Sequence, residues 1–291
     1  MITSMSVKKY LASLEDLSNK EIIVTGGTSG IGLSLVKELL DKNASVIVMA
    51  RNINKANEVK NNLLNIHPDN PIRIIKYDQS DDQSVVASCD EIITKYPHFY
   101  AIVLNAGVFQ TKKSMTYVDD IPTTIKTNFV GLALFMKTLL AKVEGEHRYI
   151  FQGSLIAKLH DKRINSLKVN GLSSLQQYAI SKSGVEALFY HYSQIGNKYQ
   201  SFYLVEPGVT STDIIRDFPA AIRVLGRGFL KVFSHSNNRA ALTAMKALQT
   251  STEKNSFIVP RGLLTCAGLP TIKKFPKRRQ RAYLVDLVSQ I

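Results

Sequence analysis

Two residues whose side chains could move a proton, Tyr178 and Lys182, stand four positions apart in the pentapeptide Tyr-Ala-Ile-Ser-Lys. On a helix this spacing puts both side chains on one face. A free phenol has a pKa of about 10, which is too high for a good base near neutrality. A neighbouring ammonium favours the phenolate and lowers that pKa, so the pair could exchange a proton at physiological pH. Alone the pair is weak evidence, because many solvated helix faces carry it.

A glycine-rich segment near the N-terminus has the order of elements that a dinucleotide site requires. The β-branched run at 21–25 predicts a buried strand, and apolar residues at 33–40 have helical spacing. Between them, Gly26 permits a tight turn, Gly30 lets the backbone approach a pyrophosphate, and Gly32 allows close helix packing. The helix N-terminus would then face the anionic phosphates. The spacing is Gly-x-x-x-Gly-x-Gly, not the Gly-x-Gly-x-x-Gly of longer dehydrogenases.

The composition favours a folded protein in a reducing compartment. The chain has 291 residues, of which 45% are hydrophobic, enough for a substantial core in one α/β domain. Its two cysteines, Cys89 and Cys266, lie far apart, which argues against a disulfide scaffold or a zinc site. No apolar run approaches the ~20 residues of a membrane span, and residues 1–10 lack the apolar core of a signal peptide. We therefore expect a cytoplasmic protein with no metal site.

The net charge is +14, and the densest basic cluster lies near the C-terminus, at 273–281. A short apolar stretch at 282–288 follows it and has the composition of a helix. The basic tail, about 271–291, is interpreted as a solvated segment, with peripheral contact to acidic lipid as the alternative. Nucleic acid is not expected as a partner, because no binding motif accompanies the charge.

Strands and helices alternate along the chain with little interruption. Strands are predicted at 21–25, 44–50, 71–77, 100–104, 147–152, 200–205 and 256–259. Helices are predicted at 33–40, 55–66, 81–96, 117–143 (starting near 121–122), 174–197 and 239–249. This alternation predicts a mostly parallel sheet covered on both faces, a doubly wound, Rossmann-type α/β fold in a single domain. Its core would span about residues 18–260.

With these positions laid out, the chain resembles the short-chain dehydrogenase/reductase family over roughly residues 18–260. The resemblance rests on ordered motifs: Thr25-Gly26-x-x-x-Gly30-Ile31-Gly32, Asn105-Ala106-Gly107, Asn128, Ser154, Tyr178-x-x-x-Lys182 and Pro207-Gly208. Members of this family use a nicotinamide cofactor to interconvert alcohols and carbonyls. The resemblance therefore implies an NAD(P)-dependent oxidoreductase that acts on a small-molecule substrate and is a dimer or tetramer.

The same resemblance assigns roles to four catalytic residues. Tyr178 would be the general acid in reduction and the general base in oxidation. Lys182 would lower the Tyr178 pKa and hydrogen-bond the nicotinamide ribose. Ser154, after the strand at 147–152, would hydrogen-bond the substrate oxygen, and Asn128 would help hold a water that links Lys182 to solvent.

The end of the strand at 44–50 bears on the cofactor preference. A carboxylate there would bind the ribose diol of NAD and repel a 2′-phosphate, but the chain has Arg51, which can pair with a phosphate, and Ser29 can donate a hydrogen bond. NADP(H) is thus favoured over NAD(H). The residues expected to bind the cofactor are Gly26, Ser29, Gly30, Ile31, Gly32, Arg51, Asp78, Asn105, Ala106, Gly107, Tyr178, Lys182, Pro207, Gly208, Val209 and Thr210.

The distance from Ser154 to Tyr178 is unusual, since 24 positions separate them (178 − 154) and many members have about half that. A longer gap resembles the retinol dehydrogenase and protochlorophyllide oxidoreductase-like branch, whose substrates are bulky and lipophilic. The segment at 212–236 is rich in apolar residues and is interpreted as a substrate loop that lines a pocket or forms a lid, or as a core or oligomer-contact helix. His160 and His191 have no partner pattern and are interpreted as ordinary surface or packing residues.

The function that these motifs predict is hydride transfer between a nicotinamide and a carbonyl or alcohol, with Tyr178 moving the proton. One alternative is a non-catalytic NADP(H)-binding regulator, which has the same fold without turnover. A sugar-nucleotide epimerase shares the Tyr-x-x-x-Lys logic, but such enzymes usually carry a larger C-terminal substrate domain and prefer NAD.

Overall fold

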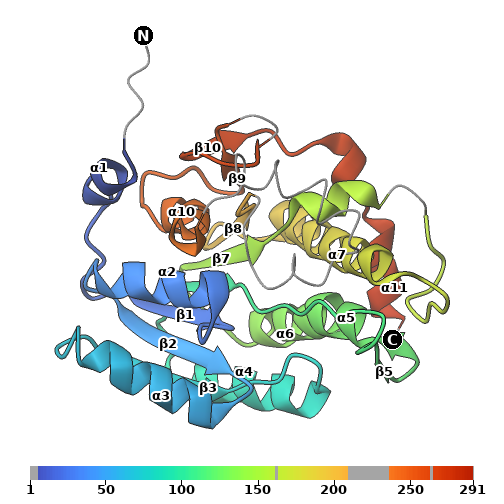
Figure 1. Cartoon of the computed structure of the whole chain (residues 1–291), viewed down its shortest axis with the longest axis horizontal. Coiled ribbons are helices and arrows are strands. Elements are labelled where there is room, and N and C mark those ends of the chain that lie inside the picture. The colour runs from blue at the N-terminus through green and yellow to red at the C-terminus, as the bar shows by residue number, and fades with distance from the viewer. Residues whose placement is uncertain (1–5, 161–162, 209–235, 263–264, 291) are drawn as a thin grey trace.

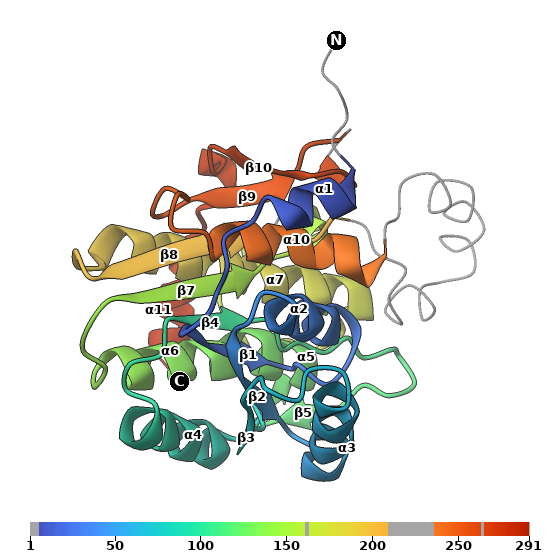
Figure 2. The same ribbon diagram turned by 90° about the vertical axis from the view of Figure 1, so that its left-hand side faces the viewer.

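The protein is built around one eight-stranded sheet. The computed structural model describes residues 6–160, 163–208, 236–262 and 265–290. The strands follow one another across the sheet in the order β10-β9-β8-β7-β4-β1-β2-β3. Their bounds are Glu21–Thr25 (β1), Ser45–Ala50 (β2), Ile72–Lys76 (β3), Ala101–Leu104 (β4), His147–Gln152 (β7), Gln200–Val205 (β8), Phe257–Pro260 (β9) and Pro270–Lys273 (β10). Figure 2 shows them stacked from β10 at the top to β3 at the bottom.

The sheet is parallel except at one edge, where β10 pairs antiparallel with β9. β1 lies between β4 and β2, so the chain reverses its direction of travel across the sheet beside β1. In open α/β sheets ligands bind outside the carboxyl ends of the strands at such a switch point. The predicted doubly wound α/β architecture is confirmed.

Helices cover both faces of the sheet and bury two separate apolar cores (Figure 1). One core is covered by α2 (Gly30–Leu40), α3 (Ile53–Leu64), α10 (Asn237–Ala247) and the short α1 (Val7–Ala12). The other is covered by α4 (Asp82–Lys95), α6 (Gly131–Leu140), α7 (Ser174–Ile195) and α11 (Tyr283–Ser289). The strands that lie between them, such as β1 and β4, are buried on both faces, as their unbroken apolar runs predict.

Local sequence explains where the helices begin. The Asp81 carboxylate accepts from the backbone of Gln83 and Ser84 at the start of α4. At the start of α7, Ser173 and Gln176 form a reciprocal capping box. This cap matters for the site, because it fixes where the helix that carries Tyr178 and Lys182 begins.

One predicted helix, at 117–143, is divided into several elements. A two-stranded hairpin, β5 (Tyr117–Val118) and β6 (Ile121–Pro122), precedes a single turn, α5 (Thr123–Ile125). The next segment, η1 (Lys126–Val130), is a π-helix, and only then does α6 begin. The left-handed conformations of Asp119 and Asp120 close the hairpin, which apolar periodicity does not reveal.

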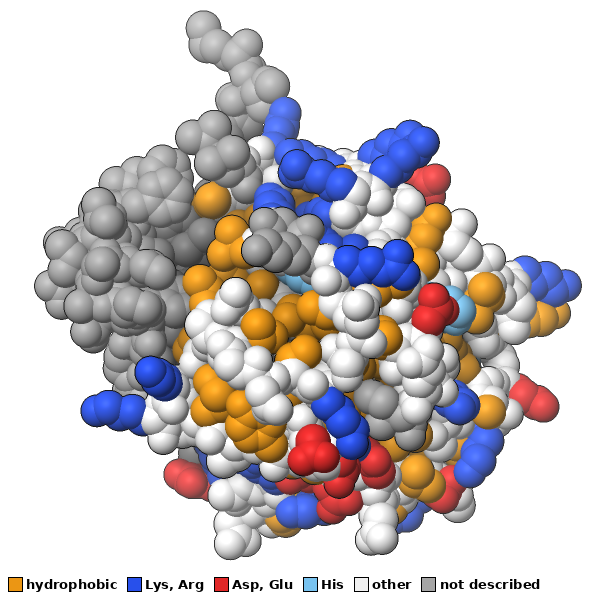
Figure 3. All heavy atoms as spheres, turned by 90° about the vertical axis from the view of Figure 1, so that its right-hand side faces the viewer, with side chains coloured by type: hydrophobic (Ala, Val, Ile, Leu, Met, Phe, Trp, Pro, Cys, Tyr) orange, Lys and Arg blue, Asp and Glu red, His pale blue; other side chains and the backbone are white. Residues whose placement is uncertain are grey.

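The interpretation of residues 271–291 as a solvated tail is wrong for part of the segment. β10 adds residues 270–273 to the sheet, and Phe275 packs against the core. Arg279, in the short 3₁₀ turn η4 (Lys277–Arg279), is 2% exposed, and Leu284 is fully buried. The cationic groups that do reach solvent include Lys273, Lys274, Lys277 and Arg278. Figure 3, which views the right-hand side of Figure 1, shows several blue basic side chains next to exposed hydrophobic ones.

Within the described ranges, no helix combines the length and apolarity that crossing a membrane requires. The same part of the chain holds no cluster of three or more His, Cys, Asp or Glu side chains with the arrangement of a metal site.

Candidate active site

The predicted glycine loop connects β1 to α2 and has the geometry that a phosphate site requires. Gly26 (φ +70°) and Gly30 (φ +54°) lie in the left-handed region, which favours glycine. A Cβ at Gly32 would lie 2.3 Å from the Gly26 carbonyl oxygen and 2.5 Å from Asn105 Nδ2. Only glycine therefore fits at Gly32, whereas the space beside Gly30 is open for 4 Å.

Asn105 and Thr25 join the glycine loop to the end of β4. Asn105 Nδ2 donates to the Thr25 carbonyl oxygen (3.0 Å) and to that of Gly26 (3.4 Å). The backbone N–H of Ala106 donates to Thr25 Oγ1 at 2.9 Å. These bonds satisfy polar groups where the two strands end and hold the predicted Asn105-Ala106-Gly107 segment against the loop.

A cavity of about 860 Å³ lies along the carboxyl edge of the sheet. Of the described residues predicted to bind the cofactor or to act in catalysis, all but Asn128 line it. These are Gly26, Ser29, Gly30, Ile31, Gly32, Arg51, Asp78, Asn105, Ala106, Gly107, Ser154, Tyr178, Lys182, Pro207 and Gly208. Val209, Thr210 and residues 212–235 of the predicted substrate loop lie outside the described residues. The cavity runs past the N-terminus of α2, which suits a phosphate-bearing ligand.

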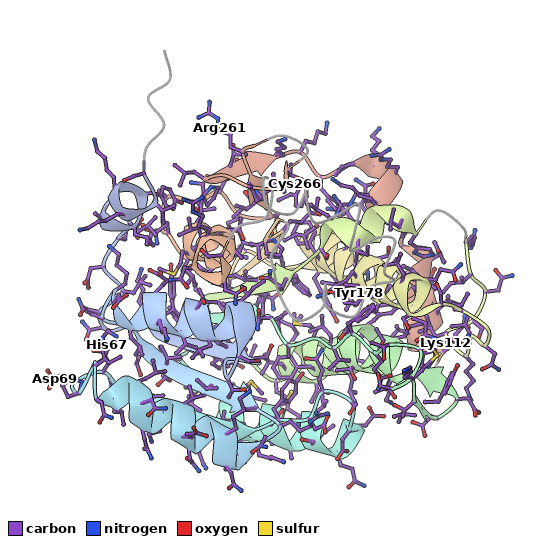
Figure 4. All side chains as sticks on the ribbon, viewed as in Figure 1. His67, Asp69, Lys112, Tyr178, Arg261 and Cys266 are labelled. Carbon is purple, nitrogen blue, oxygen red and sulfur yellow. The ribbon has the colours of Figure 1, made fainter. Side chains whose placement is uncertain are left out.

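Tyr178 and Ser154 meet inside this cavity. Figure 4 shows Tyr178 in the middle of the fold, whereas Lys112 lies at the periphery. The Ser154 hydroxyl lies close enough to the phenol of Tyr178 to lower its pKa. Ser154 also caps the 3₁₀ turn η2 (Leu155–Leu159), since its Oγ accepts from the Ile156 N–H. The 24-position gap therefore does not separate the two hydroxyls.

Burial raises the pKa of Tyr178 to about 12, and the neighbouring Ser154 hydroxyl acts in the opposite direction. This increase in the pKa of Tyr178 is opposite to the decrease that its spacing to Lys182 predicts. The physical reason is that the ring is only 7% exposed, and burial penalises the phenolate. The phenol therefore holds its proton at neutral pH.

Lys182 lies on the same face of α7, one turn beyond Tyr178. Its Nζ is 5.9 Å from the centre of the Tyr178 ring and donates to the Gln152 carbonyl oxygen at 3.0 Å. Burial lowers the pKa of Lys182 to about 8, while the negative charge of Glu186 raises it. The ammonium is thus tied to the end of β7.

Asn128 lies in the π-helix η1 and contacts the site indirectly. Its Oδ1 accepts from the Val108 N–H (2.7 Å), and its Nδ2 donates to the Val108 carbonyl oxygen (2.9 Å). The same Nδ2 donates to Ser181 Oγ at 3.0 Å, next to Lys182 in the chain. A Cβ on Gly107 would lie 3.3 Å from Asn128 Oδ1 and 3.6 Å from Lys182 Nζ, so these groups crowd around one backbone segment.

The far end of the cavity is lined by Arg51 and Asp78, which follow β2 and β3. Arg51 is exposed, and Asp78 accepts from the backbone N–H and the hydroxyl of Ser80. Sequence reasoning missed Lys55, which is also exposed and lines the same end from the first turn of α3. Its position three residues after the cap Asn52 is the signal that could have indicated it.

Comparisons with known proteins agree with this arrangement. Residues 20–223 match the family model described as short chain dehydrogenase. The chain is 26% identical over 258 residues to short-chain dehydrogenase TIC 32 B, chloroplastic, of Brassica napus, which covers 80% of this chain and 77% of that protein. It is 24% identical over 235 residues to retinol dehydrogenase 12 of Mus musculus, covering 74% and 71% of the two chains.

Solved structures share the fold at lower identity. A short chain dehydrogenase from Burkholderia cenocepacia in complex with NADP superposes with a TM-score of 0.66, at 20% identity, over 84% of this chain and 96% of that chain. An uncharacterized protein from Mycobacterium paratuberculosis reaches a TM-score of 0.74 at 19% identity, covering 96% of both chains. The chain therefore belongs to the short-chain dehydrogenase/reductase family, near its retinol dehydrogenase branch, and is an NAD(P)-dependent oxidoreductase.

Proposed function

We propose that this protein reduces a lipophilic carbonyl compound to an alcohol with NADPH, and catalyses the reverse oxidation with NADP⁺. The observation that carries the proposal is that Ser154, Tyr178 and Lys182 line one cavity that continues to the glycine loop. One ligand lying along this cavity would reach both the helix N-terminus and the two hydroxyls.

A nicotinamide nucleotide bound here would supply or accept the hydride. The backbone of Gly30, Ile31 and Gly32 at the start of α2 is suited to the pyrophosphate, because free N–H groups and the positive end of the helix dipole meet there. The fit is supported by the open space beside Gly30, since backbone can approach a ligand most closely where no side chain intervenes.

Tyr178 would act as the proton donor in reduction. Its phenol is protonated at neutral pH, because burial raises its pKa to about 12. Ser154 would donate a hydrogen bond to the substrate oxygen as negative charge develops on it, which lowers the barrier when the donor is already in place. After donation, the phenolate would be stabilised by the Lys182 ammonium, one turn away on α7.

The preference for NADPH rests on charge at the far end of the cavity. Arg51 follows β2 where a carboxylate would favour NAD, and Lys55 lines the same region. A guanidinium pairs with phosphate through two parallel hydrogen bonds, so this end suits a 2′-phosphate. Ser29, which makes no capping hydrogen bond at the start of α2, adds a hydroxyl donor.

A lipophilic substrate is supported by the side chains around the two hydroxyls. Leu155 and Ile156 follow Ser154 along the cavity, and Phe109 meets the Tyr178 ring edge to face, with 5.4 Å between centroids. The relatives named retinol dehydrogenase point to the same class of substrate. An apolar wall beside the two hydroxyls would orient a carbonyl compound. Its apolar part would pack against the wall, and only its oxygen would face the hydroxyl groups.

The remaining properties are also proposals. A homodimer or homotetramer and a cytoplasmic location would be in keeping with the family and with a content of only two cysteines, which suits a reducing compartment. Several exposed cations in residues 271–291 leave peripheral contact with acidic lipid as a further proposal.

The test is turnover of NADPH with a panel of lipophilic aldehydes, ketones and quinones. Tyr178→Phe is expected to keep NADPH affinity and to lose about 10²–10⁴-fold in kcat, the range for a general acid. The matched control is Tyr199→Phe, because the Tyr199 side chain is 46% exposed. Full activity of Tyr178→Phe would refute the mechanism. Tight NADPH binding by a wild type that turns over nothing in the panel would favour the non-catalytic regulator.

A further inference from the structure

The C-terminal segment inserts a buried cation behind the proposed active site. Arg279 is 2% exposed, and its guanidinium contacts two carboxylates, Glu186 and Glu206, that are each fully buried. Its Nε donates to Glu186 Oε2 at 3.0 Å, and its Nη2 donates both to Glu186 Oε1 and to Glu206 Oε1. Phe257 and Phe275 stack on the guanidinium, 5.3 Å and 5.7 Å from its central carbon.

The two carboxylates belong to the elements that carry the site. Glu186 lies on α7, one turn after Lys182 and two turns after Tyr178, so all three residues lie along one face. Glu206 follows β8 directly, and the next two residues, Pro207 and Gly208, line the cavity. Arg279 therefore bridges α7, which carries Tyr178 and Lys182, and the residue that follows β8.

The same segment also holds the loop that follows Ser154. Arg281 donates from Nη2 to the His160 carbonyl oxygen, and the Tyr283 hydroxyl lies 3.4 Å from His160 Nε2. His160, interpreted from sequence as an ordinary residue, is 5% exposed and ends the 3₁₀ turn that Ser154 begins. Residues 279–283 thus contact α7, the residue that follows β8 and the end of the turn that Ser154 begins.

Burial makes this bridge sensitive to its partners. Two carboxylates without a cation would pay a large desolvation penalty, and removing one partner of a buried pair is far more costly than breaking an exposed one. A guanidinium can serve both carboxylates at once because its N–H groups point outward in a fixed fork, whereas an ammonium is a point charge. The geometry is therefore specific to arginine.

We propose that Arg279 is a positioning residue of the active site, which through Glu186 and Glu206 holds the Tyr178–Lys182 face of α7 against the end of β8. The inference rests on the proposed reductase function of that face. Arg279 touches neither Tyr178 nor Ser154, so its effect reaches the chemistry through α7 and the charge of Glu186.

The charge of Glu186 couples the bridge to Lys182. The charged groups that face Glu186 are Lys182 on its own helix, Glu206 after β8, and Arg279 and Arg281 from the C-terminal segment. The Glu186 carboxylate raises the pKa of Lys182, in opposition to burial. Neutralising Glu186 removes this effect, so Lys182 would lose its proton at a lower pH.

The experiment compares four variants of the full chain with the wild type, using NADPH turnover and NADPH titration from pH 6 to 10. Arg279→Met removes the bridge, and the matched control Arg278→Met removes the same charge from the exposed neighbour. Arg279→Lys keeps the charge without the fork. Glu186→Gln keeps an acceptor for Arg279 and leaves Glu206 as its counter-charge, so it tests the coupling without an unpaired buried cation.

We expect Arg279→Met to lower kcat at least about tenfold and to keep KM within about threefold of the wild-type value. The reason is that displaced catalytic groups slow the chemical step more than they weaken substrate binding. Arg279→Lys should recover part of this loss, and Arg278→Met should match the wild type. Glu186→Gln should move the alkaline limb of activity to lower pH by at least about half a unit. A folded Arg279→Met protein with wild-type kcat would overturn the proposal, and so would an unmoved limb in Glu186→Gln.

Two further outcomes are separable. If Arg279→Met does not fold, the alkaline limb of activity in Glu186→Gln decides whether the proposal stands. If the wild type turns over no carbonyl, the proposed function fails, and the coupling is judged from NADPH affinity alone. Lys182 lines the cavity, so the alkaline limb of NADPH affinity should then shift in Glu186→Gln and stay in place in Arg278→Met.

Discussion

Asn128 donates a hydrogen bond from Nδ2 to Ser181 Oγ at 3.0 Å, and this bond joins the π-helix η1 to the residue before Lys182. The Ser181 hydroxyl in turn donates to the Tyr178 carbonyl oxygen at 2.9 Å. A π-helix inserts one extra residue into a helical turn and often occurs at functional sites. Here it turns the Asn128 amide toward both α7 and Val108.

We predict that Asn128→Ala lowers kcat by about 10- to 100-fold, since it frees α7 from η1 and leaves both polar groups of Val108 without their partner. Steady-state kinetics with NADPH and a carbonyl substrate measure the effect. Asn62→Ala is the control, because Asn62 is exposed in the last turn of α3. Unchanged kcat in Asn128→Ala would show that η1 does not position the site.

Lys182 should make the stability of the folded protein depend on pH. Burial lowers the pKa of Lys182 from 10.5 to about 8, so between these values the unfolded chain binds more protons than the folded one. Its contribution to stability therefore increases as pH rises through that window. We expect the Tm of the wild type minus the Tm of Lys182→Met to increase from pH 7.5 to pH 9.5.

Thermal unfolding followed by circular dichroism measures this difference. Lys112→Met is the matched control, because Lys112 is exposed at the periphery (Figure 4) and should show no such trend. A difference between wild type and Lys182→Met that stays constant from pH 7.5 to 9.5 would contradict the prediction.

Arg51 should govern the choice of cofactor. We predict that Arg51→Ala weakens NADPH binding by about 10- to 100-fold and leaves NADH binding unchanged, because only NADPH carries the 2′-phosphate. Fluorescence titration of both cofactors separates the two effects. Arg73→Ala serves as the control, since Arg73 is exposed on β3 and pairs with Glu21. Equal losses for both cofactors would assign Arg51 another role.

Gly184 should be intolerant of any side chain. A Cβ at this position of α7 would lie 2.2 Å from Cγ of Phe129, which is fully buried in η1. We predict that Gly184→Ala lowers the free energy of unfolding by about 1–3 kcal/mol, the usual cost of overpacking. Urea denaturation measures it. Adding Phe129→Leu should recover part of the loss, and a double variant with purely additive losses would argue against the clash.

The sequence predicted the parallel core and most of the cavity wall, because those residues obey local rules. The β-branched run before Gly26 and the helical spacing after Gly32 each report on their own element, and parallel strands bring their carboxyl ends together. Tyr178 and Lys182 share a face because any helix would put them there. Every strand predicted within residues 18–260 is present.

The missed features depend on contacts that no local pattern records. The basic residues at 277–281 look alike in sequence, yet Arg279 is buried and Arg278 is exposed. Their difference arises from Glu186 and Glu206, which come from distant parts of the chain. Likewise, the direction of the Tyr178 pKa depends on burial, which the spacing to Lys182 does not reveal.

The Arg279 bridge also bears on the order of folding. Its two partners lie 93 and 73 residues earlier in the chain, so the bridge closes loops of those lengths. During synthesis, β8 and α7 emerge before their cation, and the carboxylates of Glu186 and Glu206 must stay hydrated until Arg279 arrives. Contacts of such separation form late. Collapse of the core around α7 should therefore follow the synthesis of Arg279, and the nascent chain should become competent for its nucleotide only then.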